Sequence, residues 1–202
     1  VIDFSRKGNI SDPITLMADN PGTVFIQNSN LTGWTLGAWV HGGATGFRIQ
    51  DINFKVLNNI GAGGSNAIQI ESADNVEFYN NTINEVAGMG IVCKGGPLTS
   101  GVTSDNIWVL GNNFRPSGTN PFAQVTGLGH LSNEYYGSKG SHWMYVGQFG
   151  SNPDPNKGEN WDHVNGCSKM VIANNTFVGA TAGRDVQLGP ALRNSYVVNN
   201  TF

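Results

Sequence analysis

An eight-residue phrase that recurs five times constrains the fold of this chain more than any other feature. In every copy the third and last residues are apolar, the second and fourth vary, and the fifth to seventh are rich in Asn. The copies are Phe47–Phe54, Val76–Ile83, Ile107–Phe114, Met170–Phe177 and Ser195–Phe202. Such alternation predicts a β-strand with one buried face in each copy.

Four of the five copies place Asn at the same position of the phrase, as Asn81, Asn112, Asn175 and Asn200, whereas the first copy has Ile52 there. Asn tolerates left-handed backbone conformations, and stacked identical amides can hydrogen-bond to one another. We therefore expect a column of Asn residues at a turn that repeats from copy to copy.

A second, weaker phrase precedes the first one. Its copies are Ala67–Glu71, Gly90–Lys94, Trp143–Gly147 and Asp185–Gly189, with Leu36–Val40 as the earlier member, and Pro13–Ala18 and Thr23–Gln27 form the coil before it. Two strands per repeat, joined by bends rich in Gly or Asn, predict an all-β solenoid of about five stacked coils. Residues 1–202 then form a single domain.

Composition agrees with this prediction and excludes several classes of function. The chain has 28 Gly, only 12% charged residues and a net charge of −3, without a run of basic residues. These values disfavour a helical protein and a nucleic-acid partner. No apolar stretch approaches the ~18 residues of a membrane span. Cys93 and Cys167 lack metal-ligand spacing, and a disulfide between them is left open.

The Asn-Asn-Thr-Phe phrases resemble the repeats of the pectate-lyase-like superfamily of parallel β-helix proteins. Residues 12–34 and 41–54 are similar to the early coils of the chondroitinase B and alginate lyase family. This resemblance implies a right-handed parallel β-helix and a polysaccharide ligand. Because this fold carries lyases, hydrolases, tailspikes and adhesins, the function has to be argued from the site.

One sheet of the expected solenoid collects polar residues on its outer face. Outward positions of the weaker phrase predict Glu71 beside Lys94, with Tyr145, Asp185 and Gln187 further along. We interpret Lys94 as a catalytic candidate and the other four as substrate-binding candidates. The alternative is that Glu71 and Lys94 form only a surface ion pair between adjacent coils.

Long connections at about 95–105, 115–141 and 147–166 interrupt the repeat. Loops of this length in a compact domain are usually functional. They point to His142 and His163 as catalytic candidates and to Trp143 and Trp161 as platforms for sugar rings, although these rings can instead pack the loops onto the sheet. Three carboxylates in the connection at 147–166 are candidate Ca²⁺ ligands, although their spacing is not that of an EF-hand. They are Asp154, Glu159 and Asp162.

Two short stretches each resemble part of a pectate lyase motif. Trp161-Asp162-His163 resembles their tryptophan-isoleucine-aspartate-histidine stretch, and residues 190–193 resemble the latter half of their Arg-x-Pro-x-x-Arg motif. The resemblance implies a role for Arg193, whereas Leu188 stands where the first arginine of the motif belongs.

Cleavage of a uronate polymer by β-elimination needs a cation that neutralises the carboxylate and a base that removes the neighbouring proton. The candidate cations are Lys94, Arg184 and Arg193, and the candidate bases are His142, His163 and Lys94. We therefore expect a polysaccharide lyase that acts on an acidic polysaccharide.

Two other functions remain open. The first is a non-catalytic glycan-binding module, adhesin or surface fibre. The second is a glycoside hydrolase or tailspike-type depolymerase that uses paired carboxylates such as Asp162 and Asp185.

A polysaccharide ligand implies a secreted or cell-surface protein. Five Asn-x-Ser/Thr sequons are present, and three of them lie in the Asn-Asn-Thr turn, so that glycosylation is left open. The chain starts at Val1 without Met and ends at Phe202 inside an expected strand. We expect a fragment, truncated at both ends, whose open coil ends allow stacking or self-association.

Overall fold

The structure, a computed structural model, describes residues 2–4, 8, 11–28, 35–56, 65–84, 89–95, 103–115, 144–146, 166–178, 185–189 and 192–202. Within these ranges all regular structure is β-strand, as the composition predicts. The strands are β1 (Ile2–Phe4), β2 (Ile14–Met17), β3 (Phe25–Asn28), β4 (Thr35–His41), β5 (Thr45–Gln50), β6 (Asn53–Val56), β7 (Ser65–Glu71), β8 (Asp74–Tyr79), β9 (Thr82–Asn84), β10 (Met89–Lys94), β11 (Ser104–Asp105), β12 (Ile107–Leu110), β13 (Asn113–Arg115), β14 (Met144–Val146), β15 (Cys167–Ser168), β16 (Val171–Ala173), β17 (Thr176–Phe177), β18 (Val186–Leu188), β19 (Leu192–Arg193) and β20 (Tyr196–Val198).

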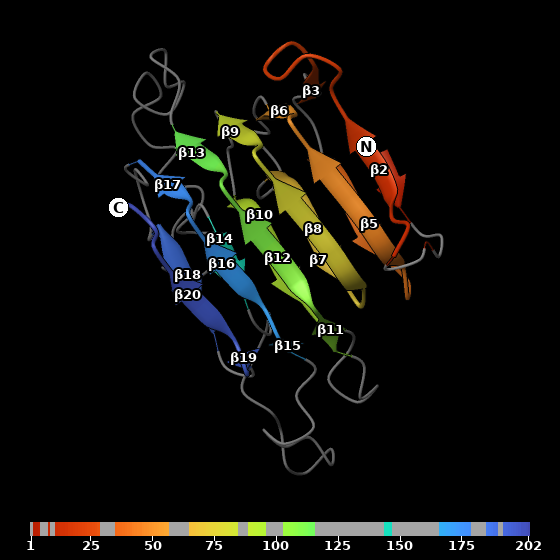
Figure 1. Ribbon diagram of the computed structural model, residues 1–202, viewed down its shortest axis with the longest axis vertical. Helices are drawn as coiled ribbons and strands as arrows, with labels where there is room; N and C mark the ends of the chain where they lie inside the picture. Colours follow the sequence, from red (N-terminus) through yellow and green to blue (C-terminus); the bar gives the residue numbers. More distant parts are fainter. Residues whose placement is uncertain are drawn as a thin grey trace.

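These strands form four sheets, and their pairings are parallel. Sheet 1 has the order β1-β4-β7-β10-β14-β18, and sheet 2 has the order β2-β5-β8-β12-β16-β20. Sheet 3 has the order β17-β13-β9-β6-β3, and the small sheet 4 has the order β11-β15-β19. Neighbours in each sheet come from successive repeats, as the parallel arrows of β5, β8, β12 and β16 show (Figure 1). The all-β prediction is confirmed, and the stacked parallel strands are consistent with a parallel β-helix.

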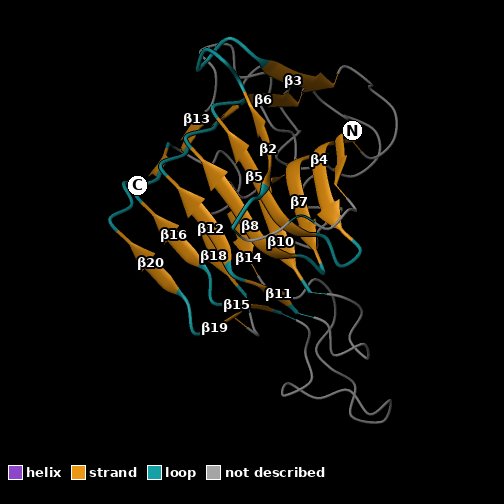
Figure 2. Ribbon diagram, turned by 45° about the vertical axis from the view of Figure 1, so that its right-hand side comes forward, coloured by secondary structure: helices purple, strands orange, loops and turns teal. Residues whose placement is uncertain are grey.

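The eight-residue phrase, hereafter the strong phrase, sets the register of sheets 2 and 3. Its third residues lie opposite one another from strand to strand, in the order Ile49, Phe78, Val109, Ile172 and Val197. Its last residues do the same in sheet 3, in the order Phe54, Ile83, Phe114 and Phe177. With the exception of Val197, all of these side chains are buried. The predicted buried columns are therefore confirmed. The ribbon shows the strands of sheet 2 in front of those of sheet 1 (Figure 2).

The predicted Asn column exists at the bend between sheets 2 and 3. Asn81 Nδ2 donates to Asn112 Oδ1, Asn112 Nδ2 to Asn175 Oδ1, and Asn175 Nδ2 to Asn200 Oδ1, each over 3.0 Å. Each acceptor oxygen also receives the backbone N–H of the preceding Asn in the column. Because these buried amides satisfy backbone groups from coil to coil, the column ties the stack together.

The left-handed backbone, however, belongs to the residue before each column member. In successive copies this residue is Asp51 (φ 59°), Asn80 (52°), Gly111 (65°), Asn174 (56°) and Asn199 (52°). The expectation that the column itself occupies left-handed positions is thus corrected. In the Asn-Asn pair, the first residue makes the turn, for which Asn and Gly are suited, and the second forms the ladder.

The interior also holds both cysteines. The Sγ atoms of Cys93 and Cys167 lie 2.7 Å apart, and both residues are fully buried as free cysteines. Burial raises the pKa of the Cys93 thiol well above its usual value. In the described part of the chain, there is also no helix with the length and apolar character needed to cross a membrane.

Candidate functional site

The outer face of sheet 1 presents the rows of side chains that the weaker phrase predicts. Gln69, Val92, Tyr145 and Gln187 lie in register on β7, β10, β14 and β18. Two residues further along, Glu71 of β7 lies opposite Lys94 of β10. Alternate residues of a strand point to opposite faces, so that Gln69 and Glu71 point away from the core residues Ile68 and Ile70. Gln69 is buried on that face, whereas Glu71 is partly exposed.

Glu71 and Lys94 form the expected ion pair, with 3.1 Å between Glu71 Oε1 and Lys94 Nζ. The other carboxylate oxygen, Glu71 Oε2, accepts a hydrogen bond of 3.1 Å from Gln69 Nε2. About a quarter of each charged side chain is exposed, 27% for Glu71 and 25% for Lys94. Since a lysine ammonium has three N–H donors, Lys94 can bind a second anion while it keeps Glu71.

His41, at the end of β4, extends this row to a third strand, because it lies opposite Glu71. Its Nε2 is 3.0 Å from Asp3 Oδ1, and its ring stacks on Trp39 with the centroids 3.7 Å apart and an interplanar angle of 18°. When Nε2–H donates to Asp3, Nδ1 of the neutral ring is left as a proton acceptor. Asp3 and Trp39 together fix the ring.

The row formed by His41, Glu71 and Lys94, hereafter the polar row, combines a cation with a titratable base. Adjacent strands are ~4.8 Å apart, so that the backbones at positions 41 and 94 are separated by roughly 10 Å. Side chains of this length span such a gap. The polar row can therefore hold an anionic group at Lys94 and accept a proton at His41.

His41 was not predicted as a site residue because of a one-residue error in register. The first copy of the weaker phrase was placed at Leu36–Val40, whereas the structure pairs Ala38 with Ile68 and Val40 with Ile70. The matching segment is therefore residues 37–41, which puts Trp39 opposite Gln69 and His41 opposite Glu71. A one-residue slip exchanges the two faces of a strand. The apolar Ala38 and Val40, matched to Ile68 and Ile70, are the signal that identifies His41.

Tyr145 and the two candidates on β18 occupy different environments. Tyr145 lies in the predicted row but is only 3% exposed and packs with Met89 and Val92. Burial raises the pKa of its phenol, which favours the neutral form. Gln187 is half-buried opposite Tyr145. Asp185 precedes β18, and its backbone carbonyl accepts the N–H of Met144.

Arg193 does not join the polar row. It lies on β19 of sheet 4, opposite Ser168, and its side chain is exposed. The other predicted site residues lie outside the described residues: they are His142, Trp143, Asp154, Glu159, Trp161, Asp162, His163 and Arg184. Among the described residues, no group of three His, Cys, Asp or Glu could hold a metal ion. The calcium site remains a prediction.

Comparisons with known proteins yield one distant likeness. No protein-family model matches the chain, and no curated protein matches it. Among solved structures, the alginate lyase from Paenibacillus sp. str. FPU-7 matches with a TM-score of 0.41 and 12% sequence identity. The match covers 96% of this chain and 64% of that one, so the chain spans less than two thirds of that structure. A likeness this distant assigns no activity.

Proposed function

We propose that the chain forms a right-handed parallel β-helix and that the outer face of sheet 1 cleaves a uronate-containing polysaccharide by β-elimination. The observation that carries this proposal is the polar row, in which three neighbouring strands bring a cation, its carboxylate partner and a histidine into register. A polymer substrate of this kind fits a secreted or cell-surface protein.

In the proposed reaction, Lys94 binds the carboxylate of one uronate residue through the donors that Glu71 does not use. Neutralising this carboxylate lowers the pKa of the adjacent C5–H. His41 Nδ1 removes the C5 proton, and the released electron pair forms the C4=C5 double bond. The C4–O glycosidic bond breaks, and the leaving oxygen takes a proton from the His41 imidazolium, which restores the neutral ring.

Two neighbours support this reaction without taking part in bond breaking. Asp3 stabilises the imidazolium while His41 holds the proton, because its carboxylate lies 3.0 Å from Nε2. Glu71 positions the ammonium group of Lys94, and the Gln69 amide positions Glu71. The positioned base contributes about 10²–10⁴-fold to the rate.

The test is a set of incubations with alginate, pectate, chondroitin and heparin, with and without Ca²⁺, followed by the ultraviolet absorbance of the unsaturated uronate product. We expect a rise with one of these polymers. Lys94→Met should lower the initial rate at least ~100-fold, because it removes the charge that stabilises the developing anion.

Lys169→Asn is the matched control. It removes one positive charge from an exposed position on the connection between β15 and β16, where φ is 51° and Asn is tolerated. This variant should keep the wild-type rate. No absorbance change with any polymer, in a folded sample, would contradict the elimination, and a non-catalytic glycan-binding module would then explain the fold better.

A further inference from the structure

Sheet 2 has an outer face of its own, built from the variable second and fourth positions of the strong phrase. Arg48, Glu77 and Trp108 lie side by side on β5, β8 and β12. In the next row Gln50, Tyr79 and Leu110 do the same. None of these positions contributes to the core. Because these side chains are not needed to fill the interior, they can take part in binding a ligand.

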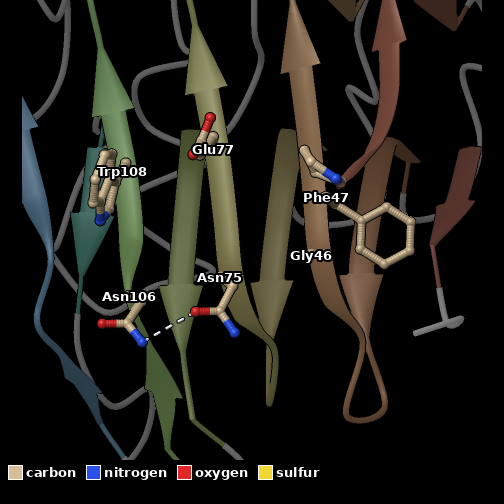
Figure 3. Close-up of a pocket in the computed structure, with 7 residues that line it drawn as sticks. Gly46, Phe47, Asn75, Glu77, Asn106 and Trp108 are labelled. Atoms are coloured by element: carbon tan, nitrogen blue, oxygen red, sulfur yellow. Dashed lines mark hydrogen bonds between the residues drawn. The ribbon is translucent and has the colours of Figure 1, made fainter. Parts of the chain in front are cut away.

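Two adjoining hollows lie on this face. One, of about 290 Å³, is lined by Asn75 and Asn106 at its edge and by Glu77 and Trp108 above them (Figure 3). The other, of about 280 Å³, is lined by Arg48, Tyr79, Leu110 and again by Glu77 and Trp108. Glu77 and Trp108 line both hollows, which therefore adjoin, and the two hollows together are hereafter called the sheet 2 groove.

The sheet 2 groove exposes two large rings. Trp108 is 44% exposed and Tyr79 is 47% exposed, on neighbouring strands and lining the same hollow. A single exposed ring on a protein surface needs no explanation. Two rings in one groove, beside polar groups, form the kind of surface that stacks against the C–H face of a sugar ring.

The polar groups of the groove are held in place before any ligand arrives. Asn106 Nδ2 donates to Asn75 Oδ1 over 3.1 Å, and Asn75 Nδ2 donates to Thr45 Oγ1 over 2.9 Å. Each amide nitrogen carries two hydrogens, so that a second N–H of each side chain remains for a hydroxyl group. Preorganised donors bind at a lower entropic cost than mobile ones.

The charges of the groove cancel. Arg48 Nε donates to Glu77 Oε2 over 2.6 Å, across the centre of the face. A charge pair of this kind can hydrogen-bond to hydroxyl groups through its remaining N–H donors and carboxylate oxygen, but it offers no net charge to a polyanion.

We propose that the sheet 2 groove binds an uncharged oligosaccharide, with Trp108 and Tyr79 as stacking platforms. This site is separate from the polar row of sheet 1 and does not depend on its elimination chemistry. It would hold a neutral glycan while the opposite sheet works on an acidic one.

Isothermal titration calorimetry with cellohexaose, mannohexaose and xylohexaose tests the proposal, with an alginate hexasaccharide as the anionic comparison. We expect saturable binding of at least one neutral hexasaccharide. Trp108→Ala should weaken this binding at least ~10-fold, through loss of the stacking platform, and Trp108→Phe should restore part of it. Both variants should keep the wild-type circular dichroism spectrum.

Tyr196→Ala is the matched control. Tyr196 is 67% exposed on β20 of sheet 2 and lies in the same row as Trp108, because Val171 pairs with both residues. It lines neither hollow. This variant should bind as the wild type does. The proposal is overturned if none of the neutral hexasaccharides binds, or if Trp108→Ala and Tyr196→Ala bind equally. It is also overturned if sedimentation shows a wild-type dimer that Trp108→Ala separates, because the groove is then a contact between two copies.

Discussion

Sheets 1 and 2 are built on the same interior but differ on their outer faces. Inside, apolar residues such as Ile68 of sheet 1 and Phe78 of sheet 2 stack in columns from repeat to repeat. Outside, sheet 1 carries the histidine and the ion pair of the polar row, whereas sheet 2 carries exposed rings and amides around a neutral charge pair. The comparison shows that the buried columns maintain the stack and that each outer face is free to acquire its own chemistry.

The largest expected effect concerns the base on sheet 1. His41→Gln should lower the elimination rate about 10²–10⁴-fold, because Gln cannot accept the C5 proton. Asp3→Asn should lower it less, since the imidazolium then loses its hydrogen-bond partner. Initial rates between pH 5 and 9 measure both effects. An unchanged rate in His41→Gln would show that a residue other than His41 removes the C5 proton.

The interior could be predicted from the sequence, because its columns obey one physical requirement. Ile49, Phe78 and Val109 have to be apolar to fill the stack, and Asn112 has to hydrogen-bond above and below, so that the repeat reveals them directly. The outer faces have no such requirement. Lys94 and Glu71 were found because their copies of the weaker phrase align without a gap.

His41 was missed for the opposite reason. Its copy of the weaker phrase begins at residue 37, whereas Leu36 was taken as the first residue. Matching Ala38 and Val40 to Ile68 and Ile70 gives the register that β4 has with β7. The sheet 2 groove was missed because Trp108 and Tyr79 stand at positions that vary from copy to copy, where no pattern marks them. Periodicity therefore finds the scaffold, and only the spatial neighbours of a residue reveal the sites.

The Asn ladder is part of the interior that both faces share, and removing its hydrogen bonds should lower the stability of the whole stack. Asn112 donates to the carbonyl of Phe78 and accepts the N–H of Asn81, so Asn112→Ala leaves buried backbone groups without partners. We expect a loss of about 2–5 kcal/mol in unfolding free energy. Asn200→Ala, at the half-buried end of the ladder, should cost less. Urea denaturation measures both, and equal losses would contradict a cooperative ladder.

The two ion pairs offer a matched comparison of the faces. Glu71→Gln on sheet 1 and Glu77→Gln on sheet 2 each remove a partly exposed pair between adjacent strands. Each should lower the unfolding free energy by less than about 1 kcal/mol, because solvent screens both pairs. Only Glu71→Gln should change the elimination rate through the position of Lys94. A loss of several kcal/mol in either variant would show that the pair is structural.

The smallest expected effect is at Asp74, the exposed first residue of β8 in sheet 2. Desolvation raises the pKa of its carboxyl, and the hydrogen bond that the backbone N–H of Asp105 donates to it over 2.9 Å offsets part of this rise. Because the folded-state pKa lies above the unfolded one, stability is lost as the pH rises through these values. Asp74→Asn should therefore raise the unfolding free energy at pH 7 by at most about 0.5 kcal/mol, and not at pH 3. Thermal denaturation at both pH values checks the sign.

The proposed elimination on sheet 1 is tested most directly by a crystal structure of His41→Gln with the uronate oligosaccharide that the wild-type protein cleaves. This variant lacks the base but keeps the cation. We expect a uronate carboxylate within about 3 Å of Lys94 Nζ, with the C5 atom of the same sugar facing position 41. An oligosaccharide bound away from sheet 1, with Lys94 in contact only with Glu71, would contradict it.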